Sequence, residues 1–193
     1  MPALKFVKEN FRKEEGFTLF ELLVVIIMIA ILSGIIFLGP NTWQKTLALD
    51  RSAQKLSQDI SQSRGLSQKG ESGGCSGSNT DGYGVYLAMS DPSQYFIYRN
   101  CDSDLNNRDR SYGGADEKLE GENILLESNI VICGLKEGGS ETSALSIFFE
   151  PPDPTVFINN IPSVTSSVTI CINDDPSKQK TIEINKAGNI NLK

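Results

Sequence analysis

One acidic residue, Glu21, stands inside an otherwise apolar stretch that runs from Phe17 to Pro40. Residues 22–38 carry no charge. A carboxylate in such surroundings costs several kcal/mol unless it is neutralised or paired, so an ionisable residue of this kind indicates a function. The alternative is a side chain that reaches the edge of the apolar layer and pairs with nothing. We expect Glu21 to pair with a cation.

The complete absence of histidine limits the other chemistry that the chain can do. It removes Ser-His-Asp and Cys-His nucleophile systems and every zinc site that uses imidazole. The formal net charge of -6, from 18 basic and 24 acidic residues, argues against a surface that coats nucleic acid. We therefore expect no enzyme activity, no cofactor and no bound metal.

The apolar stretch is long enough to be a membrane-spanning helix, since 17 to 24 residues of helix cover roughly 25 to 36 Å. The short segment before it, residues 1–16, is basic through Lys5, Lys8, Arg12 and Lys13. Such a flank stays in the cytoplasm, so the rest of the chain faces outward. The small residue Gly16 lies before the apolar stretch, whereas a secretory signal peptide is cleaved after it. Cleavage at Gly16 would keep the helix in the mature protein.

Residues 16–34, GFTLFELLVVIIMIAILSG, resemble the leader junction and N-terminal helix of type IV pilins and type II secretion pseudopilins. The resemblance implies cleavage between Gly16 and Phe17 by a prepilin peptidase, followed by N-methylation of the new Phe17 amine. It also implies that Glu21 of an incoming subunit meets the Phe17 amine of a neighbour. The implied partners are this peptidase, other pilin subunits bound through the N-terminal helix, an inner-membrane platform protein and an assembly ATPase. The resemblance also implies that the chain is a single-pass inner-membrane protein, which later enters a filament.

An amphipathic helical pattern follows the apolar stretch. Its apolar positions recur at spacings of four, three and four: Leu49, Ala53, Leu56 and Ile60. This pattern predicts a helix that lays one face on a sheet formed by the rest of the chain. The expected organisation is a leader (1–16), a transmembrane and assembly helix (17–40), the amphipathic half of the helix (41–69) and a β-rich head (70–193).

The junction between the two helical segments allows two interpretations. Gly34, Gly39 and Pro40 favour a kink or a locally unwound stretch in one long helix, because proline removes a helical hydrogen bond. Alternatively, the first helix stops and a second begins at Asn41 or Thr42, either of which can cap it.

The head contains short β-branched and aromatic runs separated by turn residues, which predict strands. The first two form a hairpin across SDPS, and the full set is 83–89, 94–99, 124–133, 144–150, 155–159, 166–173, 180–185 and 189–193. The fold class is therefore α+β: a pilin-like fold with a long N-terminal helix packed on a mostly antiparallel sheet.

All four cysteines fall in the head: Cys75, Cys101, Cys133 and Cys171. There is no CxxC pair, so neither a redox motif nor a compact zinc ribbon is indicated. An even number of cysteines outside the cytoplasm favours disulfides, with three connectivities possible. We favour Cys75–Cys101, which flank the first hairpin, together with Cys133–Cys171. Buried free thiols are the alternative.

One loop of the head, residues 102–122, is rich in Asp, Asn and Gly. Polar residues at alternate positions from Asp102 are like the start of an EF-hand. However, Asn107 and Gly113 stand where that calcium loop needs a glycine and a glutamate. The pattern favours a solvated acidic loop over a calcium site.

The order of elements in the head resembles the GspH/FimT group of minor pseudopilins. The residues concerned are GYGVYL (82–87), FFEPPDP (148–154) and KTIEINKAGNINL (180–192). The resemblance implies a structural, minor subunit of a type II secretion pseudopilus or a type IV pilus. An alternative is a FimT-like pilin that binds DNA through a basic C-terminal region, with Lys178, Lys180, Lys186 and Lys193 as the contacts.

Overall fold

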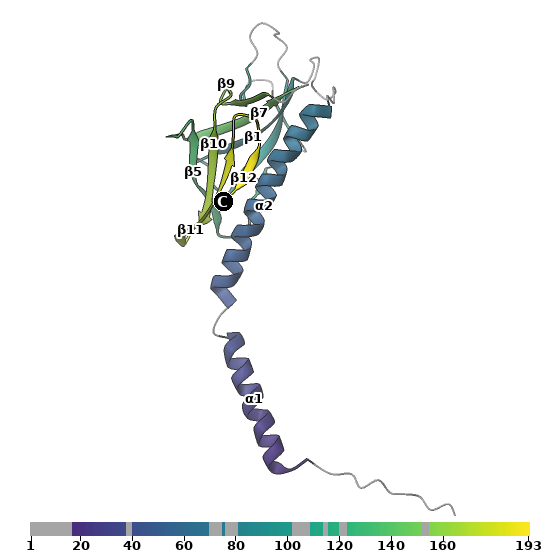
Figure 1. The fold of residues 1–193 in the computed structure, drawn as a ribbon, viewed down its shortest axis with the longest axis vertical. Coiled ribbons are helices and arrows are strands. Elements are labelled where there is room, and N and C mark those ends of the chain that lie inside the picture. Colours follow the sequence, from purple (N-terminus) through teal and green to yellow (C-terminus); the bar gives the residue numbers. More distant parts are fainter. Residues whose placement is uncertain are drawn as a thin grey trace, which may run out of the picture. The chain divides into compact units, whose positions relative to one another are not determined.

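The computed structural model describes residues 17–37, 40–69, 75, 81–101, 109–113, 116–119, 123–151 and 155–193. The chain divides into two compact units, Met1–Pro40 and Asn41–Lys193. The first contains one described helix, and the second contains a helix beside many strands (Figure 1). The expected leader and most of the acidic loop lie outside the described residues.

Helix α1 of the first unit covers Leu19–Phe37. Its sequence is almost wholly apolar and has no proline, and its only charged residue, Glu21, lies in the first turn. No helix within the described residues combines the length and hydropathy of a membrane span.

Helix α2 covers Pro40–Lys69. A second helix therefore begins near the predicted junction, but at Pro40 rather than at Asn41 or Thr42. Proline is tolerated there because the backbone N–H groups in the first turn of a helix have no acceptor within the helix. The N–H that proline lacks would therefore be unpaired in any case. The predicted apolar face is confirmed, since Leu49, Ala53, Leu56 and Ile60 are all buried.

The head holds two sheets, in which every strand pairing is antiparallel. In the large sheet the described strands follow the order β3-β2-β1-β7-β8-β9, with β4 also paired to β2. Their bounds are β1 (Gly82–Ala88), β2 (Gln94–Asn100), β3 (Glu117–Lys118), β4 (Ile124–Leu125), β7 (Ala144–Glu150), β8 (Thr155–Ile158) and β9 (Ile161–Pro162).

In the small sheet the described strands follow the order β12-β11-β10-β5-β6. Their bounds are β5 (Ile130–Glu137), β6 (Ser140–Glu141), β10 (Ser166–Ile172), β11 (Asp175–Ile184) and β12 (Ile190–Leu192). The register slips between Thr169 and Ile170 opposite β5, and again between Cys171 and Ile172 opposite β11.

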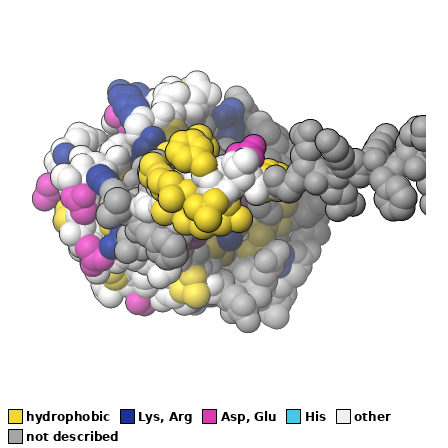
Figure 2. Space-filling view, turned by 90° about the horizontal axis from the view of Figure 1, so that it is seen from below, with side chains coloured by type: hydrophobic (Ala, Val, Ile, Leu, Met, Phe, Trp, Pro, Cys, Tyr) yellow, Lys and Arg dark blue, Asp and Glu magenta, His cyan; other side chains and the backbone are white. Residues whose placement is uncertain are grey.

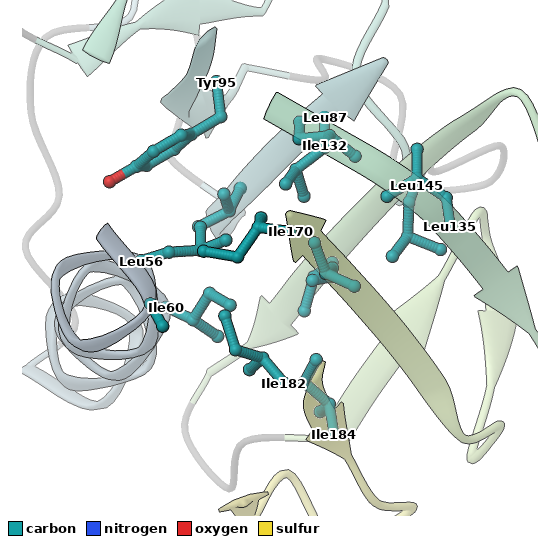
Figure 3. Close-up of a cluster of buried hydrophobic side chains, with 14 of the residues drawn as sticks. Leu56, Ile60, Leu87, Tyr95, Ile132, Leu135, Leu145, Ile170, Ile182 and Ile184 are labelled. Carbon is teal, nitrogen blue, oxygen red and sulfur yellow. The ribbon is translucent and has the colours of Figure 1, made fainter. Parts of the chain in front are cut away.

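The main core is formed by α2 and the inward faces of both sheets. Figure 3 shows Leu56 and Ile60 directed from α2 toward the small sheet, where Ile170 and Ile182 lie. All four side chains are fully buried, so α2 is part of the head's core. Burial of one such side chain contributes about 1.5–3 kcal/mol.

A second cluster lies on the other face of the large sheet, because successive strand residues point to opposite faces. It is aromatic and consists of Phe96, Tyr98, Phe148 and Phe157, with Tyr86 and Tyr112 packed against it. Gly84 faces Tyr98 in the β1–β2 register, and a Cβ atom at Gly84 would collide with the tyrosine ring. The glycine therefore makes room for this buried ring.

Most strand predictions are confirmed, including the hairpin formed by β1 and β2. The single strand expected over 124–133 is wrong, because β4 joins the large sheet and β5 joins the small one. The turn between them carries Asn129 at φ 68°, a left-handed conformation that asparagine tolerates better than most residues. The last long strand also begins earlier than expected, at Asp175, and the two-residue strands β3, β6 and β9 were not anticipated.

Candidate functional site

Glu21 makes a reciprocal set of hydrogen bonds with Thr18 at the start of α1. Its Oε2 accepts from the Thr18 backbone N–H and from the Thr18 hydroxyl, both at 3.3 Å. In return, Thr18 Oγ1 accepts from the Glu21 backbone N–H at 3.2 Å. This is a capping box, in which Thr and a Glu three residues later satisfy amides that the helix leaves unpaired. The T-x-x-E spacing before an apolar run predicts the box, but the sequence analysis missed it.

The surface of α1 is apolar and exposed. Between Leu22 and Leu32, all of its large apolar side chains except Val24 are exposed, from 46% at Leu23 to 61% at Met28 and Leu32. Viewed from below, the molecule shows a gathering of apolar side chains that few charged side chains interrupt (Figure 2). Monomeric soluble proteins rarely leave such a surface uncovered. The helix therefore presents a surface suited to lipid or to other apolar helices.

The residues expected at the processing site lie just before α1. Gly16 is outside the described residues, whereas Phe17 is 83% exposed and, like Thr18, precedes the helix. A cleavage that leaves Phe17 as the new N-terminus would create a cationic amine one residue before the capping threonine.

The cysteines form the two pairs favoured from the sequence, Cys75–Cys101 and Cys133–Cys171. Their Cα atoms are 5.5 and 6.0 Å apart. The first pair ties residue 75 to the end of β2, and the second joins the neighbouring strands β5 and β10. Both disulfides therefore act within the second unit.

Three of the four C-terminal lysines lie beside carboxylates. Lys193 Nζ is 2.7 Å from Glu183, Lys180 Nζ is 3.1 Å from Asp50, and Lys178 Nζ is 3.8 Å from Asp175. In each of these ion pairs the carboxylate partly neutralises the lysine charge that would otherwise attract a phosphate backbone. The structure therefore gives no support to the DNA-binding alternative.

Ion pairs between α2 and the head were not foreseen from the sequence. Arg51 donates to both carboxylate oxygens of Glu127, at 2.6 and 2.7 Å. Lys45 donates to Asp174 at 2.9 Å. The hydrogen bond from Arg51 lowers the pKa of Glu127, and the bond from Lys45 lowers the pKa of Asp174. No sequence spacing predicts these pairs, because the partners are 76 and 129 residues apart.

A partly buried polar contact joins the C-terminal half of α2 to the large sheet. The Tyr95 hydroxyl donates to Asp59 Oδ2 at 2.6 Å. Burial, helped by the Asp59 carboxylate, raises the pKa of Tyr95, so the phenol keeps its proton and remains a donor. Beside it lies a hollow of about 510 Å³, lined partly by Lys55 and Leu125. Within the described ranges, no three His, Cys, Asp or Glu residues are grouped to hold a metal ion.

Comparisons with known proteins point to the N-terminal segment. Residues 11–37 match the family model of the prokaryotic N-terminal methylation motif. No curated protein matches the chain.

Two solved structures of the type IV minor pilin FimU from Pseudomonas aeruginosa are similar to it. One is 15% identical with a TM-score of 0.43, covering 75% of this chain and 87% of that one. The other is 17% identical with a TM-score of 0.40, covering 75% of this chain and 92% of that one.

The matched motif includes Phe17 and Glu21 together with the whole of α1. A motif of this prepilin type implies processing by a peptidase, membrane-anchored assembly and contact with other pilins. The match itself is confined to residues 11–37.

Proposed function

We propose that the chain is a structural subunit, of the minor pilin class, that assembles into a type IV pilus or a type II secretion pseudopilus. The observation that carries this proposal is the exposed apolar surface of α1, which begins at a matched methylation motif. An apolar helix of this kind gains stability only by leaving water. Membrane lipid covers it before assembly, and the helices of neighbouring subunits cover it afterwards.

Glu21 sets the position of an incoming subunit in this proposal. In the unassembled chain its carboxylate caps its own helix through Thr18. After cleavage, the Phe17 amine of a neighbour supplies a cation, and away from water a carboxylate binds a cation more strongly than it binds the uncharged donors of the cap. This exchange of partners fixes the relative position of two helices whose other contacts are uniformly apolar. An inner-membrane platform protein and an assembly ATPase complete the machinery.

The first experiment determines the mature N-terminus by mass spectrometry of the assembled protein. We expect N-methylated Phe17 and no trace of residues 1–16. Gly16→Leu should block cleavage, because the peptidase must accept the residue before the scissile bond. Gly34→Leu is the matched control, since a side chain at that position meets nothing within 4 Å. Recovery of Met1 on assembled protein would overturn the proposal.

A second experiment separates the capping role of Glu21 from its pairing role. Glu21→Ala removes both the cap and the charge, and we expect normal cleavage but loss of incorporation into filaments. Thr18→Ala removes the capping hydroxyl and keeps the carboxylate, so incorporation should persist. Equal loss in both variants would show that helix capping alone explains the requirement.

A further inference from the structure

The outward face of the small sheet carries a row of polar side chains. Its members stand directly opposite one another on neighbouring strands, from β5 across β10 and β11 to β12: Lys136, Ser167, Glu183 and Asn191. Residues opposed in this way project from the same face of a sheet, about 5 Å apart from one strand to the next. Their chain neighbours Val168 and Ile184 are buried in the main core. The row therefore lies on the face that turns away from that core.

A hollow of about 280 Å³ is lined by all four residues of the row. Gly139, Thr165 and Asn185 stand at its ends. Gly139 lies beyond the end of β5 with φ 93°, a conformation that favours glycine, so this part of the rim carries no side chain. The volume is close to the lower end of the range for small-ligand sites, about 300–1,000 Å³. The hollow therefore admits one small ring rather than a folded segment of a partner.

Several polar groups of the hollow have no partner inside the molecule. Within the part of the chain that the structure describes, the Lys136 amine forms no ion pair or hydrogen bond. This holds although Glu141 stands opposite Lys136 on β6. Among the same residues, the Ser167 hydroxyl and the Asn191 amide make no hydrogen bond either. The hollow therefore contains a positive charge that is not balanced, beside groups that both donate and accept.

Two further groups of the hollow are held in place. Glu183 Oε2 accepts from Lys193 Nζ at 2.7 Å, so the charge of this carboxylate is already balanced. Asn185 Oδ1 accepts from the backbone N–H groups of Ala187 and Asn189, both at 2.9 Å. These two bonds occupy the oxygen of the Asn185 amide and leave its NH₂ group as a donor. The turn after β11 therefore presents a fixed amide donor at one end of the hollow.

This combination of groups favours one class of ligand. Among the described lining residues the one large apolar side chain, Ile184, is 1% exposed, so an apolar ligand gains little. A phosphate dianion would meet a single unpaired cation, Lys136, and would lie beside the Glu183 carboxylate. A hydroxylated ring with one carboxylate matches the set better. Its carboxylate binds the lysine, and its hydroxyls exchange hydrogen bonds with the remaining hydroxyl, amide and carboxylate groups.

We propose that this hollow binds an acidic sugar, that is, a sugar ring that carries a carboxylate. Lys136 binds the carboxylate, and Ser167, Asn185 and Asn191 bind the ring hydroxyls. The inference goes beyond the proposed function, because it requires the second unit alone and no assembly. A free sugar acid and a unit of an acidic polysaccharide present the same chemistry to the hollow.

Isothermal titration calorimetry of the full-length chain in detergent tests the class of ligand. Galacturonate carries both the ring and the carboxylate, whereas galactose carries the ring alone. We expect galacturonate to bind about tenfold more tightly, because a hydrogen bond between charged groups is stronger than one between neutral groups. Equal binding of the two sugars, or no binding of galacturonate, would overturn the proposal.

Polygalacturonate distinguishes the two sources of the ligand. Binding of the polymer as well as the monomer indicates a polysaccharide, and binding of the monomer alone indicates a free sugar acid. Both results support an acidic-sugar site, because both require the carboxylate and the ring.

Variants place the ligand in the hollow. Lys136→Gln should weaken galacturonate binding about tenfold and leave galactose binding unchanged. Lys55→Gln is the matched control, since Lys55 is also exposed and lies on α2, outside the hollow. Ser167→Val replaces the hydroxyl by methyl groups in a strand and should abolish binding of both sugars. An unchanged melting temperature shows that each variant folds.

The outcomes separate this inference from the proposed function. If Lys136→Gln binds galacturonate like the unmodified chain, the assigned site is wrong while the filament role stands. If the unmodified chain binds galacturonate in the hollow but is not cleaved after Gly16, the proposed function fails and the sugar site stands.

Discussion

Helices α1 and α2 follow each other in the chain but are stabilised in different ways. α1 has a largely apolar surface, and none of the large apolar side chains described between Leu19 and Leu32 is buried. α2 is amphipathic, and its residues Leu49, Ala53, Leu56 and Ile60 enter the core of the head. The head therefore holds α2 in place, whereas α1 depends on what the chain meets after synthesis. A substitution should accordingly act on folding in one helix and on assembly in the other.

The largest effect is expected in the head. Leu56→Ala removes a fully buried side chain, shown in Figure 3, and should lower the free energy of unfolding by about 2–5 kcal/mol. Leu47→Ala makes the same change on the exposed side of α2 and should cost less than about 0.5 kcal/mol. Denaturant unfolding of the detergent-solubilised chain measures both. Equal destabilisation would contradict the assignment of the two faces.

The Cys75–Cys101 disulfide should contribute almost as much, since it closes a loop with a sequence separation of 26. Replacing both cysteines by serine should destabilise the head by about 2–4 kcal/mol. Cleavage after Gly16 should proceed as before, because the disulfide lies in the second unit. Thermal unfolding measures the stability of the head, and the mass of the mature N-terminus reports cleavage. A defect in cleavage with a stable head would contradict the view that the two regions act independently.

The reverse separation is expected for α1. Ile26→Asp places a charge on a side chain that is 57% exposed in the isolated chain. Covering that charge with lipid or apolar helices costs about 2.5–3.5 kcal/mol, so assembly should fall about a hundredfold. The melting temperature of the head should not change. Quantifying the subunit in sheared filaments, with Ile26→Leu as control, tests this; a lowered melting temperature would show that α1 supports the head.

The smallest effect is expected at the Arg51–Glu127 pair, whose side chains are 59% and 38% exposed. Arg51 lowers the pKa of Glu127 in the folded head. The stabilisation is therefore complete above the ordinary pKa of glutamate and is lost as the pH falls through the lower, folded value. Glu127→Gln should reduce the melting temperature by about 2 °C at pH 7. The difference from the unmodified chain should shrink as the pH falls below the ordinary pKa of glutamate, about 4.3, and vanish below the lower, folded pKa. A constant difference across this range would exclude the ion pair as its cause.

The sequence predicts those features that depend on neighbours in the chain. The apolar stretch, the spacing of Leu49 to Ile60 and the alternation in the long strands each follow from local periodicity. The site around Glu21 was likewise identified from its apolar surroundings. Its capping partner Thr18 could also be predicted from the sequence, because the threonine stands three residues before Glu21.

The features missed depend on contacts between distant residues. The run 124–133 reads as one strand, yet the structure divides it between two sheets at Asn129. The pairs Arg51–Glu127 and Lys45–Asp174 join segments whose proximity exists only in the folded head. The basic C-terminal residues form a candidate phosphate contact in the sequence, but in the folded head Lys180 lies beside Asp50. One sequence cannot reveal such pairings, since they follow from tertiary packing.

The division of strands between the two sheets has a consequence for how the head folds. Among the described strands, the chain leaves the large sheet after β4, returns at β7 and leaves again after β9. The large sheet is complete only once β9 has been made, and the small sheet only once β12 has been made, because β5 must wait for β10. Such non-local pairing makes folding slow and cooperative, since loop closure precedes the gain from contacts. A chain cut after β9 would leave the inner edge of β5 unpaired, and the head should fold as a whole or not at all.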